Sequence, residues 1–145
     1  MSVPPSANTG IILLAEDEET DVVMFRLALK RAEMLFPLQV ANDGQEAVDY
    51  LSGHDPYDNR TRYPLPALII LDLKMPRMSG FDVLAWLSGR PDLRQIPAVV
   101  LSSSSYAQDI QRATELGARE YYVKPHSVDA LSKLLQSATG KWLQL

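Results

Sequence analysis

The sequence predicts a doubly wound α/β domain in which five helices cover a five-stranded parallel sheet. Five short apolar runs alternate along the chain with segments whose apolar residues recur at helical spacing. Each strand together with the helix after it has roughly the length of a βαβ repeat. Alternation of this kind places parallel strands in one sheet with helices on both of its faces.

Length and composition favour one intracellular domain. The chain has 145 residues, which suits a single domain, and it has no cysteine, so no disulfide contributes to the fold. Residues 1–10 form a polar, proline-containing stretch unlike a signal peptide, and no apolar run approaches the length of a membrane span. We therefore expect a flexible tail at 1–10, one domain over 11–145, and a cytoplasmic protein without membrane contact.

The charge balance argues against nucleic acid as a direct partner. The formal net charge is -4, the pI is near 5.1, and the basic residues are scattered along the chain instead of forming a stripe. Phosphate backbones are held by a surplus of lysine and arginine, which this chain lacks.

Two strands and two helices are predicted in the first third of the chain. The apolar run 11–15 is the first strand, and the acidic residues 16–19 follow it. The next helix is marked by apolar residues at near-helical spacing, namely Val22, Phe25, Leu29, Ala32 and Phe36. Residues 38–41 form the second strand. Asp43 and Glu46, at the spacing of a capping box, begin the second helix.

Residues 53–66 interrupt this pattern because they are rich in residues that favour turns. A loop of this length is unusual in a compact domain. Two interpretations are open, a solvated connection and a binding element. Tyr57, Arg60, Arg62 and Tyr63 are the side chains that make the second interpretation worth testing.

The rest of the chain supplies three more strands and three more helices. The strands are the apolar runs 68–71, 98–101 and 120–123. The helices are expected from 80 to about 89, from 110 to 116, and from 128 to the end of the chain, where apolar residues again recur at helical spacing. Gly117 is a common type of helix stop.

Polar residues follow the strands at the point where each strand ends. Glu16 and Asp17 end the first strand, Asp72 the third, Ser102 the fourth and Lys124 the fifth. An ionised carboxylate beside a core is costly unless it is paired, metal-bound or at the open end of a sheet. Because parallel strands share one carboxyl edge, we expect these side chains to converge on a ligand site there.

Three carboxylates at one sheet edge require a cation, or protons on some of the groups. At about 5 Å and an effective dielectric near 20, each pair of carboxylates repels by roughly 3 kcal/mol. Oxygen ligands that are open to solvent suit Mg²⁺, which is often completed by a phosphate oxygen. Lys124 adds a positive charge and Ser102 a hydroxyl donor. The set therefore indicates a pocket for a phosphoryl group, with the Asp72 carboxylate placed to attack it.

Taken one at a time, the same residues have simpler interpretations. Glu16 and Asp17 also suit the N-terminus of the helix that follows them. A single lysine such as Lys124 is more often solvated, and Ser102 within a serine run is more often a turn residue. The hypothesis of a site depends on all of them ending the appropriate strands.

With these residues the chain resembles the receiver domain of two-component response regulators, from Ile11 to about Leu135. The resemblance is carried by Glu16-Asp17, by Asp72-Leu73-Lys74-Met75-Pro76 with Gly80 beyond it, by Leu101-Ser102 and by Lys124-Pro125. It implies a flavodoxin-like, CheY-like sheet with the strand order 2-1-3-4-5.

The resemblance implies a role for each residue of the acidic group. Asp72 is the phosphoacceptor and receives the phosphoryl group from a phosphohistidine of a sensor histidine kinase. Asp17, Asp72 and the backbone carbonyl of Lys74 bind Mg²⁺, while Glu16 acts through water.

The resemblance also implies how the phosphoryl group is held and sensed. Ser102 hydrogen-bonds a phosphoryl oxygen, and Lys124 pairs with the phosphoryl group. Tyr121 is the switch aromatic, which turns inward as Ser102 moves. The Lys124-Pro125 peptide bond is expected to be cis, a state that needs a proline.

Expected partners follow from the same resemblance. No effector domain follows the last helix, so we expect output through protein contacts. The long loop and the missing output domain are similar to the small regulators that are paired with bacterial phytochromes. A homodimer through the fourth helix, fifth strand, fifth helix and C-terminal tail is a further expectation, with Trp142, Leu143 and Leu145 extending that surface. In the alternative, Trp142 and Leu143 fold back onto their own domain.

Three hypotheses about function remain. The first is a stand-alone, phosphorylation-switched regulator that is not a turnover enzyme. The second is a phosphatase of the haloacid dehalogenase type, which is weak because Lys74 stands where that family needs a second aspartate. The third is a pseudo-receiver that binds partners without phosphorylation; such proteins usually lack the acceptor, an acid or the lysine, and none is missing here.

Overall fold

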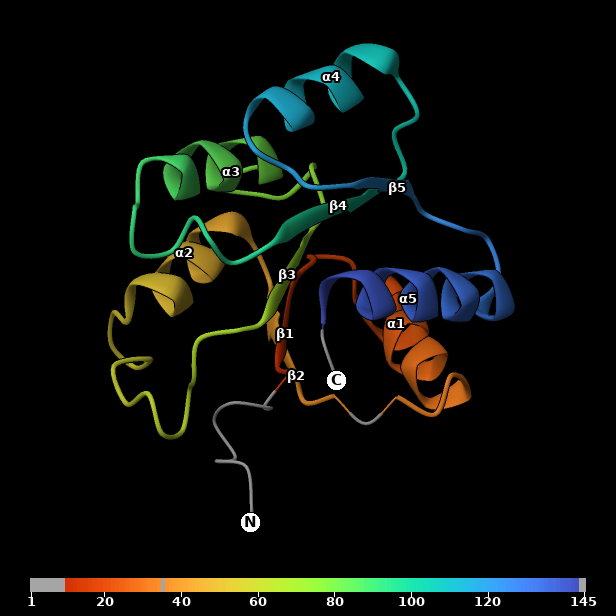
Figure 1. Cartoon of the computed structure of the whole chain (residues 1–145), viewed down its shortest axis with the longest axis horizontal. Coiled ribbons are helices and arrows are strands. Elements are labelled where there is room, and N and C mark those ends of the chain that lie inside the picture. Colours follow the sequence, from red (N-terminus) through yellow and green to blue (C-terminus); the bar gives the residue numbers. More distant parts are fainter. Residues whose placement is uncertain (1–9, 35, 144–145) are drawn as a thin grey trace.

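The computed structural model describes residues 10–34 and 36–143, and its centre is a five-stranded sheet (Figure 1). All neighbouring strands are parallel, and their order is β2-β1-β3-β4-β5. The strands are β1 (Ile12–Ala15), β2 (Leu38–Ala41), β3 (Leu68–Leu71), β4 (Ala98–Ser102) and β5 (Tyr121–Val123). The predicted α/β class and the strand order 2-1-3-4-5 are confirmed.

Helices cover both faces of the sheet, as Figure 1 shows. On one face, α1 (Glu19–Arg31) and α5 (Val128–Trp142) pack against each other. The other face carries α2 (Gly44–Ser52), α3 (Gly80–Ser88) and α4 (Ala107–Glu115). Side chains alternate along each strand, so Leu13 and Ile69 join the core beneath α2 and α3, while Leu14 and Ile70 join the core beneath α1 and α5.

Backbone hydrogen bonds extend the sheet just past the ends of its strands. The Glu16 N–H donates to the Ala41 carbonyl at 2.9 Å, and the Asp72 N–H donates to the Ala15 carbonyl at 3.0 Å. The Lys124 backbone N–H donates likewise to the Ser102 carbonyl, at 2.8 Å. The residues after β1, β3 and β5 are therefore held by rigid backbone at one edge of the sheet.

The second helix begins as predicted, but the Glu46 side chain has a different partner from the one that a capping box would give it. The Asp43 side chain accepts a hydrogen bond from the Glu46 N–H at 2.8 Å and so caps α2. The Glu46 carboxylate lies 3.5 Å from the Tyr57 hydroxyl, which donates to it. This contact ties the long loop to the first turn of α2.

The loop over residues 53–66 is packed on α2 and contains neither helix nor strand. The rings of Tyr50, Tyr57 and Tyr63 form a cluster with centroid separations of 5.1 to 6.1 Å. The Arg60 guanidinium donates to the carbonyls of Tyr50 at 2.8 Å, Leu51 at 2.9 Å and Tyr63 at 3.2 Å. Two of these carbonyls end α2, so Arg60 serves as its C-terminal cap. Tyr57, Arg60 and Tyr63 thus have structural roles.

Replacing Arg60 with alanine is expected to lower the free energy of unfolding by about 1–3 kcal/mol, because carbonyl groups lose a charged donor. Urea unfolding followed by circular dichroism measures the change. Arg62→Ala is the matched control, since Arg62 is exposed and lies over the Tyr63 ring at 5.4 Å. Its expected loss is about 0.5 kcal/mol. Equal losses in the two variants would contradict the capping role.

The expectation of a cis Lys124-Pro125 peptide bond is wrong. The cis bond that the structure has among its described residues is Asp55-Pro56, in the long loop. The two isomers of an X-Pro bond differ by only about 0.5–1 kcal/mol, so the surrounding structure decides between them and the dipeptide does not.

The end of α5 packs onto its own domain. Leu143 is only 4% exposed within the core beneath α1 and α5, and Trp142 packs against the same core. Of the two alternatives for Trp142 and Leu143, the structure has the one in which they fold back. Leu145 and the tail at 1–9 lie outside the described residues.

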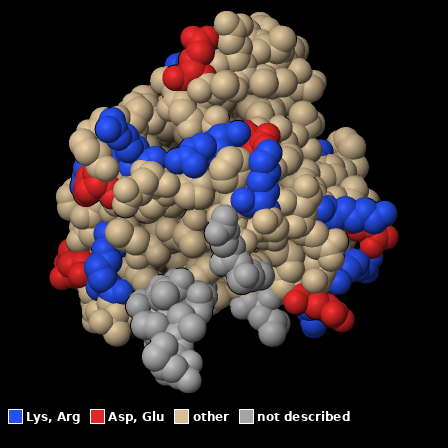
Figure 2. Space-filling view, in the orientation of Figure 1, with Lys and Arg blue, Asp and Glu red and all other residues tan. Residues whose placement is uncertain are grey.

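The surface mixes charges of both signs. Figure 2 shows basic and acidic side chains close to one another over one face. Ion pairs on the described surface include Arg31–Asp129, Arg90–Asp92 and Lys141–Glu120. Among the helices of the described residues, none has the length and apolar character needed to cross a membrane.

Candidate functional site

Three carboxylates meet at the carboxyl edge of the sheet, as the sequence predicts. Glu16 and Asp17 follow β1 and Asp72 follows β3, and each offers an oxygen that lies within 4.8 Å of the other two. Glu16 and Asp72 are buried, at 3% and 6% exposure, whereas Asp17 is exposed. Buried carboxylates this close together need a cation or a proton.

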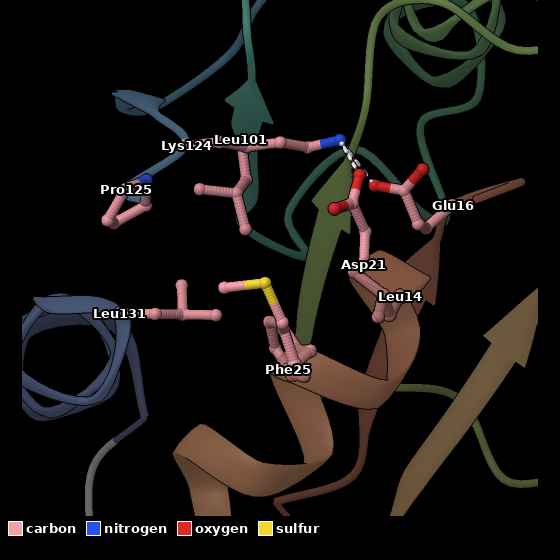
Figure 3. Close-up of a pocket in the computed structure, with 9 residues that line it drawn as sticks. Leu14, Glu16, Asp21, Phe25, Leu101, Lys124, Pro125 and Leu131 are labelled. Atoms are coloured by element: carbon pink, nitrogen blue, oxygen red, sulfur yellow. Dashed lines mark hydrogen bonds and ion pairs between the residues drawn. The ribbon is translucent and has the colours of Figure 1, made fainter. Parts of the chain in front are cut away.

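Lys124 supplies one positive charge from the end of β5. Its Nζ lies 2.7 Å from Glu16 Oε1 and 2.7 Å from Asp21 Oδ2, and Figure 3 shows these side chains together. It also lies 3.2 Å from Asp72 Oδ2. Burial alone lowers the pKa of Lys124, but hydrogen bonds to Asp21 and Glu16 and the Asp72 charge raise it above its ordinary value. The side chain is therefore an ammonium ion held at the centre of the acids.

Asp21 is a member of this site that the sequence analysis missed. It lies in the first turn of α1 and is half-buried beside Lys124. A signal was present in the sequence, because Asp21 falls near the start of the helix that follows the first strand, only four positions after Asp17. The charged run 16–19 obscured this spacing.

Asp72 is oriented by the backbone around it. Its Oδ1 accepts a hydrogen bond from the Leu73 N–H at 2.7 Å, and its Oδ2 faces Lys124. Gly80 lies directly against the Asp72 carbonyl, since a Cβ at Gly80 would stand 2.2 Å from that oxygen. The start of α3 therefore fixes the position of the acceptor backbone.

Ser102 and Tyr121 are linked through a residue that was not predicted. Ser102 is fully buried at the end of β4, and its Oγ accepts a hydrogen bond from the Ser104 N–H at 3.2 Å. The Tyr121 hydroxyl donates to the Ser104 carbonyl at 2.8 Å. The Ser104 hydroxyl donates to Asp109 Oδ2 at 2.5 Å, in the first turn of α4. In the sequence, nothing distinguishes Ser104 from its neighbours in the run of four serines. Only the structure shows that Ser104 is buried.

Asp17 and Asp72 are reached from solvent through an open groove. The residues that line it come from the loops after β1, β3, β4 and β5 and from the start of α1: Asp17, Glu18, Asp21, Met24, Asp72, Lys74, Ser103, Val123, Lys124, Pro125 and His126. Lys74 is exposed at its rim, two residues after Asp72. A group carried by another protein can therefore approach Asp72 from outside.

Burial changes the acid–base behaviour of Glu16. The pKa of Glu16 is raised to about 7, because burial and the nearby Asp72 charge raise it by more than the hydrogen bonds from Lys124 and from the Glu18 N–H lower it. The folded protein thus holds a proton on Glu16 more readily than the unfolded chain, in which the pKa is near 4.5. This contribution to stability is fully present below 4.5 and is lost as the pH rises through about 7.

Without divalent metal, we expect the free energy of unfolding to fall by about 2 kcal/mol between roughly pH 4 and pH 8 on account of Glu16. Urea unfolding in a chelating buffer across this range measures the slope. Glu16→Gln, which carries no charge at any pH, should give a flatter profile. Identical pH profiles for the two proteins would contradict this assignment.

The donor set suits a hard divalent cation. It consists of carboxylate oxygens, of which those of Asp17 and Asp72 line the open groove and those of Glu16 are buried close to them. Mg²⁺ prefers oxygen ligands and keeps part of its water shell, which a solvent-facing cluster allows. Glu16, Asp17 and Asp72 are therefore fit to hold such an ion.

Comparison with known proteins identifies the family. The family described as response regulator receiver domain matches residues 12–136. Response regulator Rcp1 of Synechocystis sp. is 34% identical over 134 residues, which cover 92% of this chain and 89% of that protein. The crystal structure of the Mn²⁺-bound form of Rcp1 has a TM-score of 0.81 at 34% identity, covering 93% of this chain and 95% of that one.

Two further solved structures are similar. Response regulator RPA3017 in red light signaling of R. palustris is 30% identical with a TM-score of 0.88, covering 92% of this chain and 94% of that one. The phosphorylated cyanobacterial phytochrome response regulator RcpA is 32% identical with a TM-score of 0.84, covering 93% of this chain and 94% of that one. The family match runs from β1 into α5 and includes every residue of the site, so this protein belongs to the response regulator receiver domain family.

Proposed function

We propose that this protein is a cytoplasmic response regulator that accepts a phosphoryl group on Asp72 from a phosphohistidine of a sensor histidine kinase. One observation carries the proposal. The buried Asp72 carboxylate lines a solvent-open groove, belongs to an acidic cluster suited to a metal, and faces the ammonium group of Lys124. The protein switches between two states and is not a turnover enzyme.

The metal in this proposal is Mg²⁺, held by Asp17, Asp72 and the backbone carbonyl of Lys74, with Glu16 acting through water. When bound, it neutralises the carboxylates and the charge that develops on the transferring phosphoryl group. Support comes from the oxygen-only donor set and from the relative Rcp1, of which a Mn²⁺-bound form is known.

The chain's own residues then carry the transfer. An oxygen of the Asp72 carboxylate attacks the phosphorus atom, and the phosphorus–nitrogen bond to the kinase histidine breaks with its electron pair remaining on nitrogen. The product is an acyl phosphate on Asp72. Lys124 pairs with its negative oxygens, and the Ser102 hydroxyl donates a hydrogen bond to one of them.

The conformational switch uses Ser102 and Tyr121. Their shared link to Ser104, and through it to Asp109, gives a route from the site to α4. Movement of Ser102 toward a phosphoryl oxygen would withdraw its oxygen from the Ser104 N–H. The surface of α4, β5 and α5 would then change its affinity for protein partners, as a population shift between two states.

A phytochrome-linked kinase is the partner that the relatives favour. RcpA is a phytochrome response regulator, and RPA3017 belongs to red light signaling. A homodimer through α4, β5 and α5 is part of this proposal. Trp142 and Leu143 contribute little to this dimer, because they pack in the core of their own domain.

Intact-mass spectrometry after incubation with acetyl phosphate tests the proposal. We expect one added phosphoryl group with Mg²⁺ and none after the metal is removed with a chelator. Phosphoryl transfer from an autophosphorylated bacteriophytochrome kinase tests the partner. Failure to accept phosphate from either donor and failure to bind beryllofluoride would instead favour the pseudo-receiver.

A further inference from the structure

The ammonium group of Lys124 is fully engaged in the resting protein. An ammonium group has three N–H donors. Nζ has three carboxylate acceptors within reach, on Glu16 and Asp21 at 2.7 Å and on Asp72 at 3.2 Å. The two shorter contacts go to Glu16 and Asp21, so Lys124 is held more closely by these residues than by Asp72.

A phosphoryl group on Asp72 would bring a further acceptor to this saturated donor. Glu16 belongs to the carboxylate group that suits the metal, and Asp72 carries the phosphoryl group itself. Asp21 is outside that group, and the proposed transfer gives it no role. Of the three acceptors, Asp21 is therefore the one whose contact with Lys124 can be given up without loss to either function.

The Lys124–Asp21 pair also joins two elements that are distant in sequence. Asp21 lies in the first turn of α1, and Lys124 follows β5, 103 positions later. Figure 3 shows the two side chains meeting at one end of a pocket between α1, α5 and the sheet. The apolar lining of this pocket is Leu14, Met24, Phe25, Leu101, Pro125 and Leu131. The Lys124 side chain is 16% exposed and that of Asp21 35%, so water screens the pair only in part.

We propose that Asp21 is the acceptor that Lys124 releases when Asp72 is phosphorylated, so that the Lys124–Asp21 ion pair holds the resting state and opposes phosphorylation. This inference rests on the proposed function of Asp72. Asp21 is a positioning residue, because it acts through Lys124. When Lys124 releases Asp21, the start of α1 loses its ion pair with the connection between β5 and α5. This ion pair is separate from the hydrogen bonds that link Ser102 and Tyr121.

Titration with beryllofluoride at saturating Mg²⁺, followed by calorimetry, tests the inference. Asp21→Asn keeps the size of the side chain and removes its charge. We expect this variant to bind beryllofluoride about fivefold more tightly than the wild type, because no ion pair has to be broken. Its midpoint of urea unfolding without metal should fall. If Asp21 had a merely structural role, its replacement would weaken the binding of beryllofluoride and also lower the midpoint of unfolding.

Glu19→Gln is the matched control, since Glu19 is exposed in the same helical turn and carries the same charge. Its affinity for beryllofluoride should equal that of the wild type. Unchanged or weaker binding by Asp21→Asn would overturn the inference, as would equal tightening in Glu19→Gln, which would indicate a general charge effect. A wild-type protein that does not bind beryllofluoride would instead overturn the proposed function, and the inference with it.

Discussion

Replacing Asp72 with asparagine is expected to abolish phosphoryl uptake from acetyl phosphate, measured as the loss of the added mass in intact-mass spectrometry. The amide oxygen of asparagine is a poor nucleophile, and among residues 10–34 and 36–143 no other carboxylate both follows β3 and faces Lys124. Affinity for Mg²⁺ should fall by at least about tenfold, because one of three clustered carboxylates is lost.

The fold of this variant should be retained. Asparagine removes a charge that Glu16 and Asp17 repel, and it also removes a partner of Lys124, so the two effects offset each other. We expect the free energy of unfolding without metal to change by less than about 1 kcal/mol. Asp55→Asn, in the exposed part of the long loop, is the control and should take up phosphate normally. Normal uptake by Asp72→Asn would refute the assignment of the acceptor.

Replacing Gly80 with alanine is expected to lower the free energy of unfolding by about 2–4 kcal/mol. The added Cβ would stand 2.2 Å from the Asp72 carbonyl oxygen and 3.0 Å from both the Asp72 carbonyl carbon and the Leu73 Cα. These are backbone atoms that cannot rotate away. The acceptor segment would have to shift, so phosphoryl uptake should slow as well. Urea unfolding and the rate of mass gain measure the two effects.

Gly140→Ala is the matched control because it makes the same change in α5. A Cβ at Gly140 would have no neighbouring atom within 4 Å. Alanine also favours helix over glycine, so this variant should be more stable than the wild type by about 0.5–1 kcal/mol. We therefore expect Gly80→Ala to lower the free energy of unfolding and Gly140→Ala to raise it. A Gly80→Ala protein as stable as the wild type would show that the start of α3 does not constrain Asp72.

Much of the site followed from the ends of the predicted strands. Because parallel strands share one carboxyl edge, locating each strand was enough to bring Glu16, Asp17, Asp72 and Lys124 together. Ser102 is at the end of β4 as expected, and Tyr121 is two hydrogen bonds away from it through Ser104. The roles of these residues in phosphoryl chemistry remain the proposal that the experiments above test.

Other features could not be predicted because they depend on how helices and loops pack. The sequence favoured a solvated connection for the long loop and left a binding element as the second interpretation, whereas packing on α2 gives Tyr57, Arg60 and Tyr63 structural roles. Trp142 and Leu143 suited both a dimer surface and their own core, and only the position of α5 decided between them. The isomer of Lys124-Pro125 was predicted wrongly, since a small energy difference is settled by local surroundings.

The sequence by itself determined the α/β class, the parallel sheet and the edge where the acids meet, because these depend on apolar periodicity and on the residues that end each strand. Only the tertiary structure decided that Asp21 binds Lys124 together with the predicted residues of the site. The Lys124–Asp21 contact joins residues 103 positions apart and depends on how α1 lies against the end of β5. That geometry is set by side-chain packing between α1, α5 and the sheet, which no one-dimensional pattern contains.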